Sequence, residues 1–193
     1  FYPGAMSEAR NIELKPIVDQ VGGADVVLIG ANDPEGMRRH TDECRFRGYP
    51  FAADPSQQLA RMDGDDIKPL IEGAEYLFTN EYEAALIEQK TGWTAADLAA
   101  IVNVRIITLG PDGARIERRG SDPVLVGVPE EESKADPTGV GDAFRAGFLA
   151  GQSWGLSDER SAQVGSLVAT YVIETIGTQE YQLAQQHFLG RLA

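Results

Sequence analysis

The chain has 193 residues, of which 42% are hydrophobic and 24% are charged, and its formal net charge is −13. These proportions predict one well-buried α/β domain of ordinary soluble composition, covering residues 1–193. The negative charge repels phosphodiester backbones and anionic bilayers, so general binding to nucleic acid or to a membrane surface is not expected.

The cysteine content and the start of the chain bear on its cellular context. The single cysteine, Cys44, excludes an internal disulfide and a cysteine-cluster metal site, and it suits the reducing cytoplasm. The chain starts Phe1-Tyr2-Pro3-Gly4 without a methionine, and apolar runs such as 26–29 are too short to span a bilayer. We therefore expect a cytoplasmic protein, and a fragment of a longer one whose active site extends upstream.

Short apolar runs alternate with helical segments along the chain. Strands are expected at 26–29, 51–53, 76–79 and 104–109. Helices are expected at 34–47, 65–72, 80–90 and 94–102, two of them closed by Gly48 and Gly92. An antiparallel edge pair follows at 114–119 and 124–128, and then mainly helices, including 143–149 and an amphipathic helix at 157–176 that ends at Gly177. The alternation predicts an α/β fold in three layers (α/β/α), with a mostly parallel sheet between helices.

Polar clusters directly follow several predicted strands, at 32–33, 54–56, 79–80 and 110–113. Ligands of parallel sheets bind beyond the carboxyl ends of the strands. We therefore expect these clusters to share one crevice.

The most informative motif is the run Asp136-Pro137-Thr138-Gly139-Val140-Gly141-Asp142-Ala143-Phe144. Gly139 and Gly141 allow backbone angles at which successive N–H groups converge on a phosphoryl group at a helix start. Asp142 beside them is placed to accept a proton from an attacking hydroxyl. The alternative is an ordinary loop in which Asp142 only complements the helix dipole. The run is not a P-loop, because no Lys-Ser/Thr follows it.

This run resembles the second signature of the ribokinase/phosphofructokinase-B kinase family, Asp-Thr-Thr/Ser-Gly-Ala-Gly-Asp. Pro137 and Val140 depart from that form, but the two glycines, Asp136, Thr138 and Asp142 are kept. The resemblance implies a ribokinase-like fold and an ATP- and Mg²⁺-dependent kinase. It places the catalytic base at Asp142 and an anion hole at the backbone of Gly139, Val140 and Gly141.

The Asn-x-x-Glu motif formed by Asn80 and Glu83 follows a predicted strand. Taken alone, it fits a helix N-cap with a reciprocal capping box. The family resemblance implies instead a role in positioning Mg²⁺ and phosphate, with Glu83 acting through metal-bound water.

The segment Thr108-Leu109-Gly110-Pro111-Asp112-Gly113 is as typical of a plain turn as of a binding site. The resemblance implies that Thr108, Gly110 and Gly113 contact the phosphates and ribose of ATP. It also places Gly177 near the adenine pocket, where the residues alone indicate only a helix end. Asp136 and Thr138 are candidate ligands of K⁺.

Three sequence segments, 1–6, 54–61 and 139–149, resemble those of bacterial adenosine kinases of the ribokinase-like type. The resemblance covers essentially the whole chain. It implies that Phe1 stacks on a nucleobase and that Gln57 and Gln58 approach the nucleoside. Solvated loop positions explain the two glutamines equally well.

The N-terminal portion of such kinases, with its β-lid and ribose-binding residues, is not in this chain. We therefore expect the isolated 193 residues to be nearly inactive, because lids exclude water during phosphoryl transfer. The sequence predicts transfer from ATP to the 5′-hydroxyl of a nucleoside, first of all adenosine, in purine salvage. A sugar kinase and a non-catalytic nucleoside- or nucleotide-binding protein stay open, as does a homodimer. His40 and His187 lie in no motif, which disfavours Ser-His-Asp hydrolysis.

Overall fold

The computed structural model describes residues 4–192. The chain forms two compact units, Phe1–Ile107 with Glu117–Ser121 and Thr108–Ile116 with Asp122–Ala193. We call them the first and the second unit and describe each by itself. In the part of the chain that the structure describes, no helix is both long enough and apolar enough to cross a membrane.

Six strands form a sheet in chain order, β1-β2-β3-β4-β5-β6. Their bounds are Val27–Ile29, Phe51–Ala53, Tyr76–Asn80, Val104–Thr108, Ala114–Arg118 and Val124–Val126. The pairs β1–β2 and β2–β3 are parallel, and β5–β6 is antiparallel with Arg115 opposite Leu125. The expected α/β class with a parallel sheet and an antiparallel edge pair is therefore confirmed.

The helices of the first unit begin and end where local chemistry predicts. They are η1 (Gly4–Asn11), α1 (Leu14–Val21), α2 (Pro34–Arg47), η2 (Ser56–Ala60), α3 (Gly64–Ile71), α4 (Glu81–Thr91) and α5 (Ala95–Ile101). The Asp33 carboxylate caps α2 by accepting from the Gly36 N–H, and Gly48 ends the helix at φ 70°. Thr94 caps α5 through a capping box with Asp97. Each cap satisfies backbone groups that the helix leaves unpaired.

The core of the first unit lies between these helices and its strands. Its buried apolar residues include Met37, Cys44, Phe51, Leu59, Ile67, Leu70, Leu77, Ile87 and Leu98. Burial raises the pKa of the Cys44 thiol to about 11, so the thiol stays protonated. Cys44 is thus a small core residue of α2.

Two regions of the first unit differ from the expectation. Helices η1 and α1 occupy residues that the sequence left unassigned, and the segment after β2 is the 3-10 helix η2 rather than an open loop. The Ser56 hydroxyl donates to the Asp54 carboxylate over 2.6 Å, which folds the start of this turn back on itself. Complete burial of Leu59 then fixes the turn against the core.

The second unit contains η3 (Gly110–Asp112), α6 (Val140–Ser153), α7 (Asp158–Ile173) and α8 (Gln185–Leu192). Helix α6 begins at Val140, three residues before the expected start, because Gly139 caps it at φ 83° and its carbonyl accepts from the Ala143 N–H. Helix α7 ends at Ile173 rather than 176. The Ile173 carbonyl accepts from the Ala135 N–H over 2.7 Å, and the Gly177 N–H donates to the Asp136 carboxylate instead of continuing the helix.

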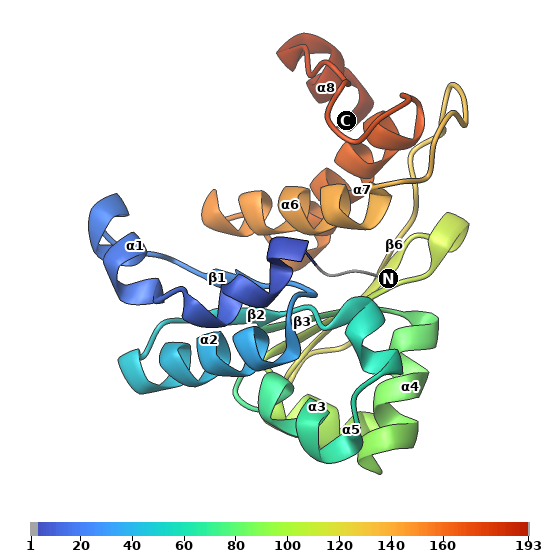
Figure 1. Cartoon of the computed structure of the whole chain (residues 1–193). Helices are drawn as coiled ribbons and strands as arrows, with labels where there is room; N and C mark the ends of the chain where they lie inside the picture. Colours follow the sequence, from blue (N-terminus) through green and yellow to red (C-terminus); the bar gives the residue numbers. More distant parts are fainter. Residues whose placement is uncertain (1–3, 193) are drawn as a thin grey trace. The chain divides into compact units, whose positions relative to one another are not determined.

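Helices α6 and α7 pack against each other in the second unit (Figure 1). Glycines bring the two backbones together: a Cβ on Gly147 would lie 2.8 Å from the Gly165 Cα, and one on Gly165 would lie 2.7 Å from the Phe144 carbonyl oxygen. The apolar residues expected to face the core from α7 are buried, but so are the residues between them, so the helix from Val164 to Val172 is buried on every side rather than on one face. Helix α6, which carries the start of the signature motif, is therefore fixed to α7 at backbone contact.

Candidate active site

A cavity of about 450 Å³ lies within the second unit. Four stretches of the chain form its wall: the turn after β4, the segment 128–134, and parts of α6 and of α7. The lining residues are Thr108, Gly110, Pro111, Gly113, Val128, Pro129, Glu130, Glu131, Lys134, Val140, Gly141, Phe144, Ser166, Ala169, Thr170 and Ile173. Two motifs that are separate in the sequence, Thr108 to Gly113 and Val140-Gly141, thus border the same space.

The turn after β4 has the geometry that its glycines predict. The Leu109 N–H donates to the Gly113 carbonyl over 2.7 Å, which closes the turn around η3. Gly113 has φ 93° and ψ −128°, and a Cβ there would lie 1.9 Å from the Val126 carbonyl oxygen. Only glycine fits this position, because the backbone angles and the close approach both exclude a side chain.

Unsatisfied backbone donors mark the start of α6. Within residues 4–192, the N–H groups of Gly141 and Asp142 have no hydrogen-bond acceptor, whereas the next one, that of Ala143, donates to the Gly139 carbonyl. First-turn N–H groups and the positive end of the helix dipole together favour an anion. Because Gly141 also lines the cavity, these donors lie at its wall.

The Asp142 side chain is 87% exposed, and its carboxylate lies 3.6 Å from a guanidinium nitrogen of Arg145. The carboxylate is therefore not turned into the core, and a hydroxyl group from outside can reach it. This placement is compatible with a general base, which needs direct access to the proton it removes.

Asp136 and the chain after α7 hold the signature loop in place. One Asp136 carboxylate oxygen accepts from the Thr138 N–H over 2.9 Å, and the other accepts from the Gly177 N–H over 3.4 Å. A hydrogen bond with the Thr138 side chain lowers the pKa of Asp136 most, and the two N–H donors lower it further. A Cβ on Gly139 would lie 2.8 Å from the Thr178 side chain, so the segment 177–178 packs on the loop.

The wall segment 128–134 is anchored through a largely buried ion pair of the same unit. The two terminal nitrogens of Arg191 donate to the two carboxylate oxygens of Glu174, each over 2.8 Å. Arg191 also donates to the Glu130 carbonyl, and Glu174 accepts from the Glu132 N–H, both over 2.8 Å. The Arg191 guanidinium lies over the Tyr171 ring, 4.9 Å from its centroid. Helix α8 thereby fixes the backbone that forms this side of the cavity.

Asn80 and Glu83 form a capping box at the start of α4 in the first unit. The Asn80 side chain accepts from the Glu83 N–H, and a Glu83 carboxylate oxygen accepts from the Asn80 N–H, both over 2.8 Å. This is the structural role expected of an isolated Asn-x-x-Glu. The second carboxylate oxygen of Glu83 has no hydrogen-bond partner among residues 4–192, which leaves it able to accept from water.

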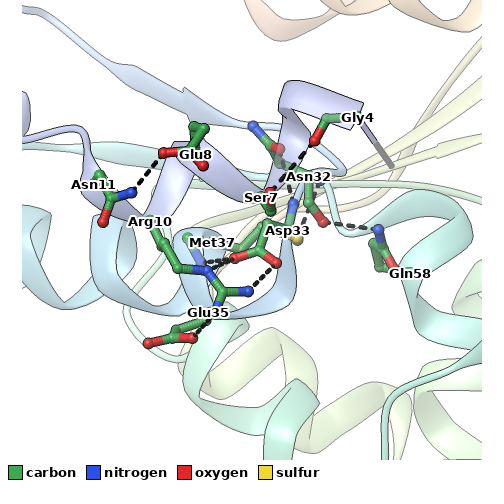
Figure 2. A network of polar contacts seen from close by, with 11 residues as sticks. Gly4, Ser7, Glu8, Arg10, Asn11, Asn32, Asp33, Glu35, Met37 and Gln58 are labelled. Carbon is green, nitrogen blue, oxygen red and sulfur yellow. Dashed lines mark hydrogen bonds and ion pairs between the residues drawn. The ribbon is translucent and has the colours of Figure 1, made fainter. Parts of the chain in front are cut away.

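The two glutamines after β2 differ in their surroundings. Gln57 is exposed, whereas Gln58 is buried and its amide donates to the Asn32 carbonyl over 2.7 Å (Figure 2). Gln58 therefore joins the loops after β1 and β2 of the first unit and is not a solvated loop residue. Phe1, the expected nucleobase contact, lies outside the described residues.

The family model of the pfkB carbohydrate kinases matches residues 1–185. The chain belongs to the pfkB family of carbohydrate kinases. Among curated relatives, it is 27% identical over 158 residues to a nucleoside kinase of Methanocaldococcus jannaschii, covering 80% of this chain and 51% of the relative. A nucleoside kinase of Methanothermobacter thermautotrophicus is 29% identical over 182 residues, covering 93% of this chain and 57% of the relative.

The structure of Burkholderia thailandensis nucleoside kinase in complex with inosine superposes on this pfkB chain with a TM-score of 0.92 and 33% identity. The superposition covers 100% of this chain and 63% of that one. The predicted ribokinase-like fold is confirmed. This pfkB chain spans about half of the length of the curated relatives it matches.

Sequence reasoning did not find a polar network at the start of this pfkB chain. The Arg10 guanidinium donates to both Asp33 carboxylate oxygens, over 3.0 and 2.6 Å, and also pairs with Glu35 (Figure 2). A Cβ on Gly36 would lie 3.1 Å from the Arg10 backbone nitrogen, so η1 packs closely on α2. The cap signal at Asp33-Pro34 was readable in the sequence, but its partner lies 23 residues away and leaves no local pattern.

Three polar residues of the cavity wall, Glu130, Glu131 and Lys134, were also missed. Lys134 pairs with Glu131 over 2.7 Å at i, i+3, which is the usual arrangement of a solvated surface pair. Among residues 4–192, no group of three or more His, Cys, Asp or Glu side chains is arranged to hold a metal ion. Nothing in this acidic run marks it as part of a cavity.

Proposed function

We propose that the whole protein transfers the γ-phosphoryl group of ATP to the 5′-hydroxyl of a nucleoside, with adenosine as the first acceptor to test. The observation that carries this proposal is the cavity of the second unit, bordered by both the Thr108–Gly113 turn and the start of α6. Its volume, about 450 Å³, suits a small organic ligand. Membership of the pfkB family and the similarity to nucleoside kinases support the reaction class.

In this proposal the nucleotide occupies the cavity. The Gly139-Val140-Gly141 backbone holds phosphoryl oxygens, because the N–H groups of Gly141 and the adjacent Asp142 lack acceptors within the described chain. Thr108, Gly110 and Gly113 contact the phosphates and ribose. The adenine ring of the nucleotide lies along apolar lining residues, with Gly177 close to it. These apolar residues are Val128, Pro129, Phe144, Ala169 and Ile173.

Asp142 is the proposed catalytic base. Its exposed carboxylate takes the proton of the acceptor hydroxyl while the hydroxyl oxygen forms a bond to the γ-phosphorus. The bond between that phosphorus and the β–γ bridging oxygen breaks, and ADP leaves with the electron pair. Phe1, Gln57 and Gln58 are the proposed contacts to the nucleoside.

Two cations complete the proposal. Glu83, beside Asn80, fits an outer-sphere contact to Mg²⁺ because one of its carboxylate oxygens has no partner within residues 4–192. When bound, Mg²⁺ neutralises phosphate charge. We assign K⁺ to Asp136 and Thr138, because the Thr138 side chain hydrogen-bonds to the Asp136 carboxylate in the signature loop.

Substitution Asp142→Asn in the whole protein tests the base. It should lower kcat by about a hundredfold or more while changing ATP-analogue affinity little, because only proton transfer is removed. The matched control is Asp158→Asn, a first-turn aspartate of α7 that complements a helix dipole in the same unit. Turnover retained by the Asp142 variant, or lost equally in the control, would contradict the assignment.

The acceptor is tested with a panel of adenosine, inosine, ribose and fructose. The proposal expects the highest kcat/KM for a nucleoside, whereas a preference for a free sugar would indicate a sugar kinase. Calorimetric binding of adenosine and an ATP analogue without any turnover would indicate a binding protein. With adenosine as acceptor, we further propose a cytoplasmic role in purine salvage, and sedimentation would show whether the protein is a homodimer.

A further inference from the structure

Arg145 lies one helical turn after Asp142 on α6, and its burial is unlike that of the aspartate. Its side chain is only 14% exposed, whereas that of Asp142 is 87% exposed, and the nearest charged atoms of the two are 3.6 Å apart. The carboxylate thus points to solvent, while the positive charge that it faces is held inside the protein.

This pair differs from three other i, i+3 ion pairs found within residues 4–192. In those pairs, Arg45–Asp42, Lys68–Asp65 and Lys134–Glu131, the basic side chain is at least 32% exposed. Such pairs are mobile, screened by water and salt, and contribute little. The Arg145 side chain, which is largely buried, has fewer conformations than an exposed one, so it presents Asp142 with a positive charge at a fixed position.

The position of Arg145 is also tied to the anion-binding loop. A Cβ on Gly141 would lie 2.6 Å from the terminal nitrogen Nη1 of Arg145, so the guanidinium rests directly against this glycine. Gly141 lines the cavity, whereas Arg145 does not. The guanidinium therefore lies behind the cavity wall, next to both the proposed base and the proposed phosphoryl-binding backbone.

We propose that Arg145 is a positioning residue for Asp142, a role that rests on the proposed function of Asp142 as the base. An exposed aspartate samples several side-chain rotamers, and only some of them aim the carboxylate at the acceptor hydroxyl. The buried guanidinium favours the rotamers that hold the carboxylate beside Gly141, where phosphoryl transfer takes place. Restricting a reacting group in this way raises the rate without strengthening substrate binding.

A kinetic double-mutant cycle in the whole protein tests this role. Arg145→Met, which keeps much of the side-chain volume, should lower kcat about tenfold and leave the KM for ATP within about threefold. In an Asp142→Asn background the same substitution should change kcat by less than about twofold, because there is no longer a base to position. Arg145→Lys should restore part of the loss. The matched control is Arg160→Met on α7, whose guanidinium contacts Gln163 and the Leu192 carbonyl and should leave kcat unchanged.

The outcomes separate this inference from the proposed function. Full turnover by Asp142→Asn would overturn the proposed base and this inference with it. An inactive Asp142→Asn together with an unchanged kcat in Arg145→Met would overturn the positioning role alone. So would equal losses in the two backgrounds, because they indicate a purely structural effect. If the methionine variant unfolds, Arg145→Gln, which is polar but uncharged, is measured in the same cycle with the same criteria.

Discussion

The buried pair of Arg191 and Glu174 gives a prediction whose magnitude follows from its geometry. Both side chains are nearly enclosed, 13% and 12% exposed, and two parallel hydrogen bonds of 2.8 Å join them. Arg191→Met removes the guanidinium, and with it the contact over the Tyr171 ring, but keeps an unbranched apolar side chain. The substitution therefore leaves the Glu174 carboxylate largely buried, with the Glu132 N–H as its one remaining donor within residues 4–192.

Breaking a buried ion pair from one side destabilises by about 3 kcal/mol or more, because the remaining charge is uncompensated. A protein of this size loses roughly 2–4 °C in Tm per kcal/mol, so the variant should melt about 6–12 °C lower at pH 7. Arg191, more than any other group, lowers the pKa of Glu174 below its ordinary 4.5. The stability from this pair is therefore fully present above the unfolded-state pKa and is lost as pH falls through the lower folded-state pKa.

The measurement is urea unfolding of wild type and variant at pH 7 and at pH 3. The difference in unfolding free energy should be large at pH 7 and smaller at pH 3, which lies below the ordinary pKa of 4.5 that Glu174 has in the unfolded chain. The double variant Arg191→Met with Glu174→Met should be less destabilised than Arg191→Met alone, since no charge stays buried. Calorimetry should also show weaker binding of an ATP analogue, because the pair anchors the cavity wall at Glu130 and Glu132. A loss below about 1 kcal/mol at pH 7, or an equal loss at both pH values, would refute this reasoning.

Two further predictions concern the turn after β4 and the start of the chain. Gly110→Ala should lose only about 1 kcal/mol, from its left-handed φ of 59° in open space, whereas Gly113→Ala should lose at least about 3 kcal/mol because its Cβ meets a carbonyl oxygen. Equal Tm values for the two variants would show that the turn adapts freely. At the other site, Arg10 lowers the pKa of Asp33 below its ordinary 3.8, so their pairing stabilises above that pH and is lost as pH falls below it. Arg10→Met should therefore shift acid unfolding, followed by circular dichroism, to higher pH, and an unchanged midpoint would count against the pairing.

The parts of the fold that were predictable are those set by neighbouring residues. Helix α2 begins and ends where Asp33-Pro34 and Gly48 place its caps, because capping acts over three or four residues. The end of α7 was predicted three residues too late, since it depends on hydrogen bonds between Ile173, Ala135 and Asp136. Nothing near position 173 records partners that lie almost forty residues earlier.

The same distinction holds for the candidate site. The glycines at 139, 141 and 113 were identified because the backbone angles that require glycine depend on neighbouring residues, which form recognisable motifs. The burial of Arg145 and the pairing of Arg191 with Glu174 could not be predicted, because each depends on how helices pack. The role of Asn80 and Glu83 was left open by the sequence, and their capping box is compatible with both readings.

The glycine contact between α6 and α7 sets how the proposed base can move. With Gly147 against Gly165, and a Cβ on Gly151 only 2.8 Å from Ser161, the two helix backbones lie in direct contact at these positions, which opposes sliding or tilting. The two helices should move as one rigid body, and their backbone N–H groups should show the slowest hydrogen exchange. Any closure around the reactants then has to come from other segments of the protein, while Asp142 on α6 stays in place.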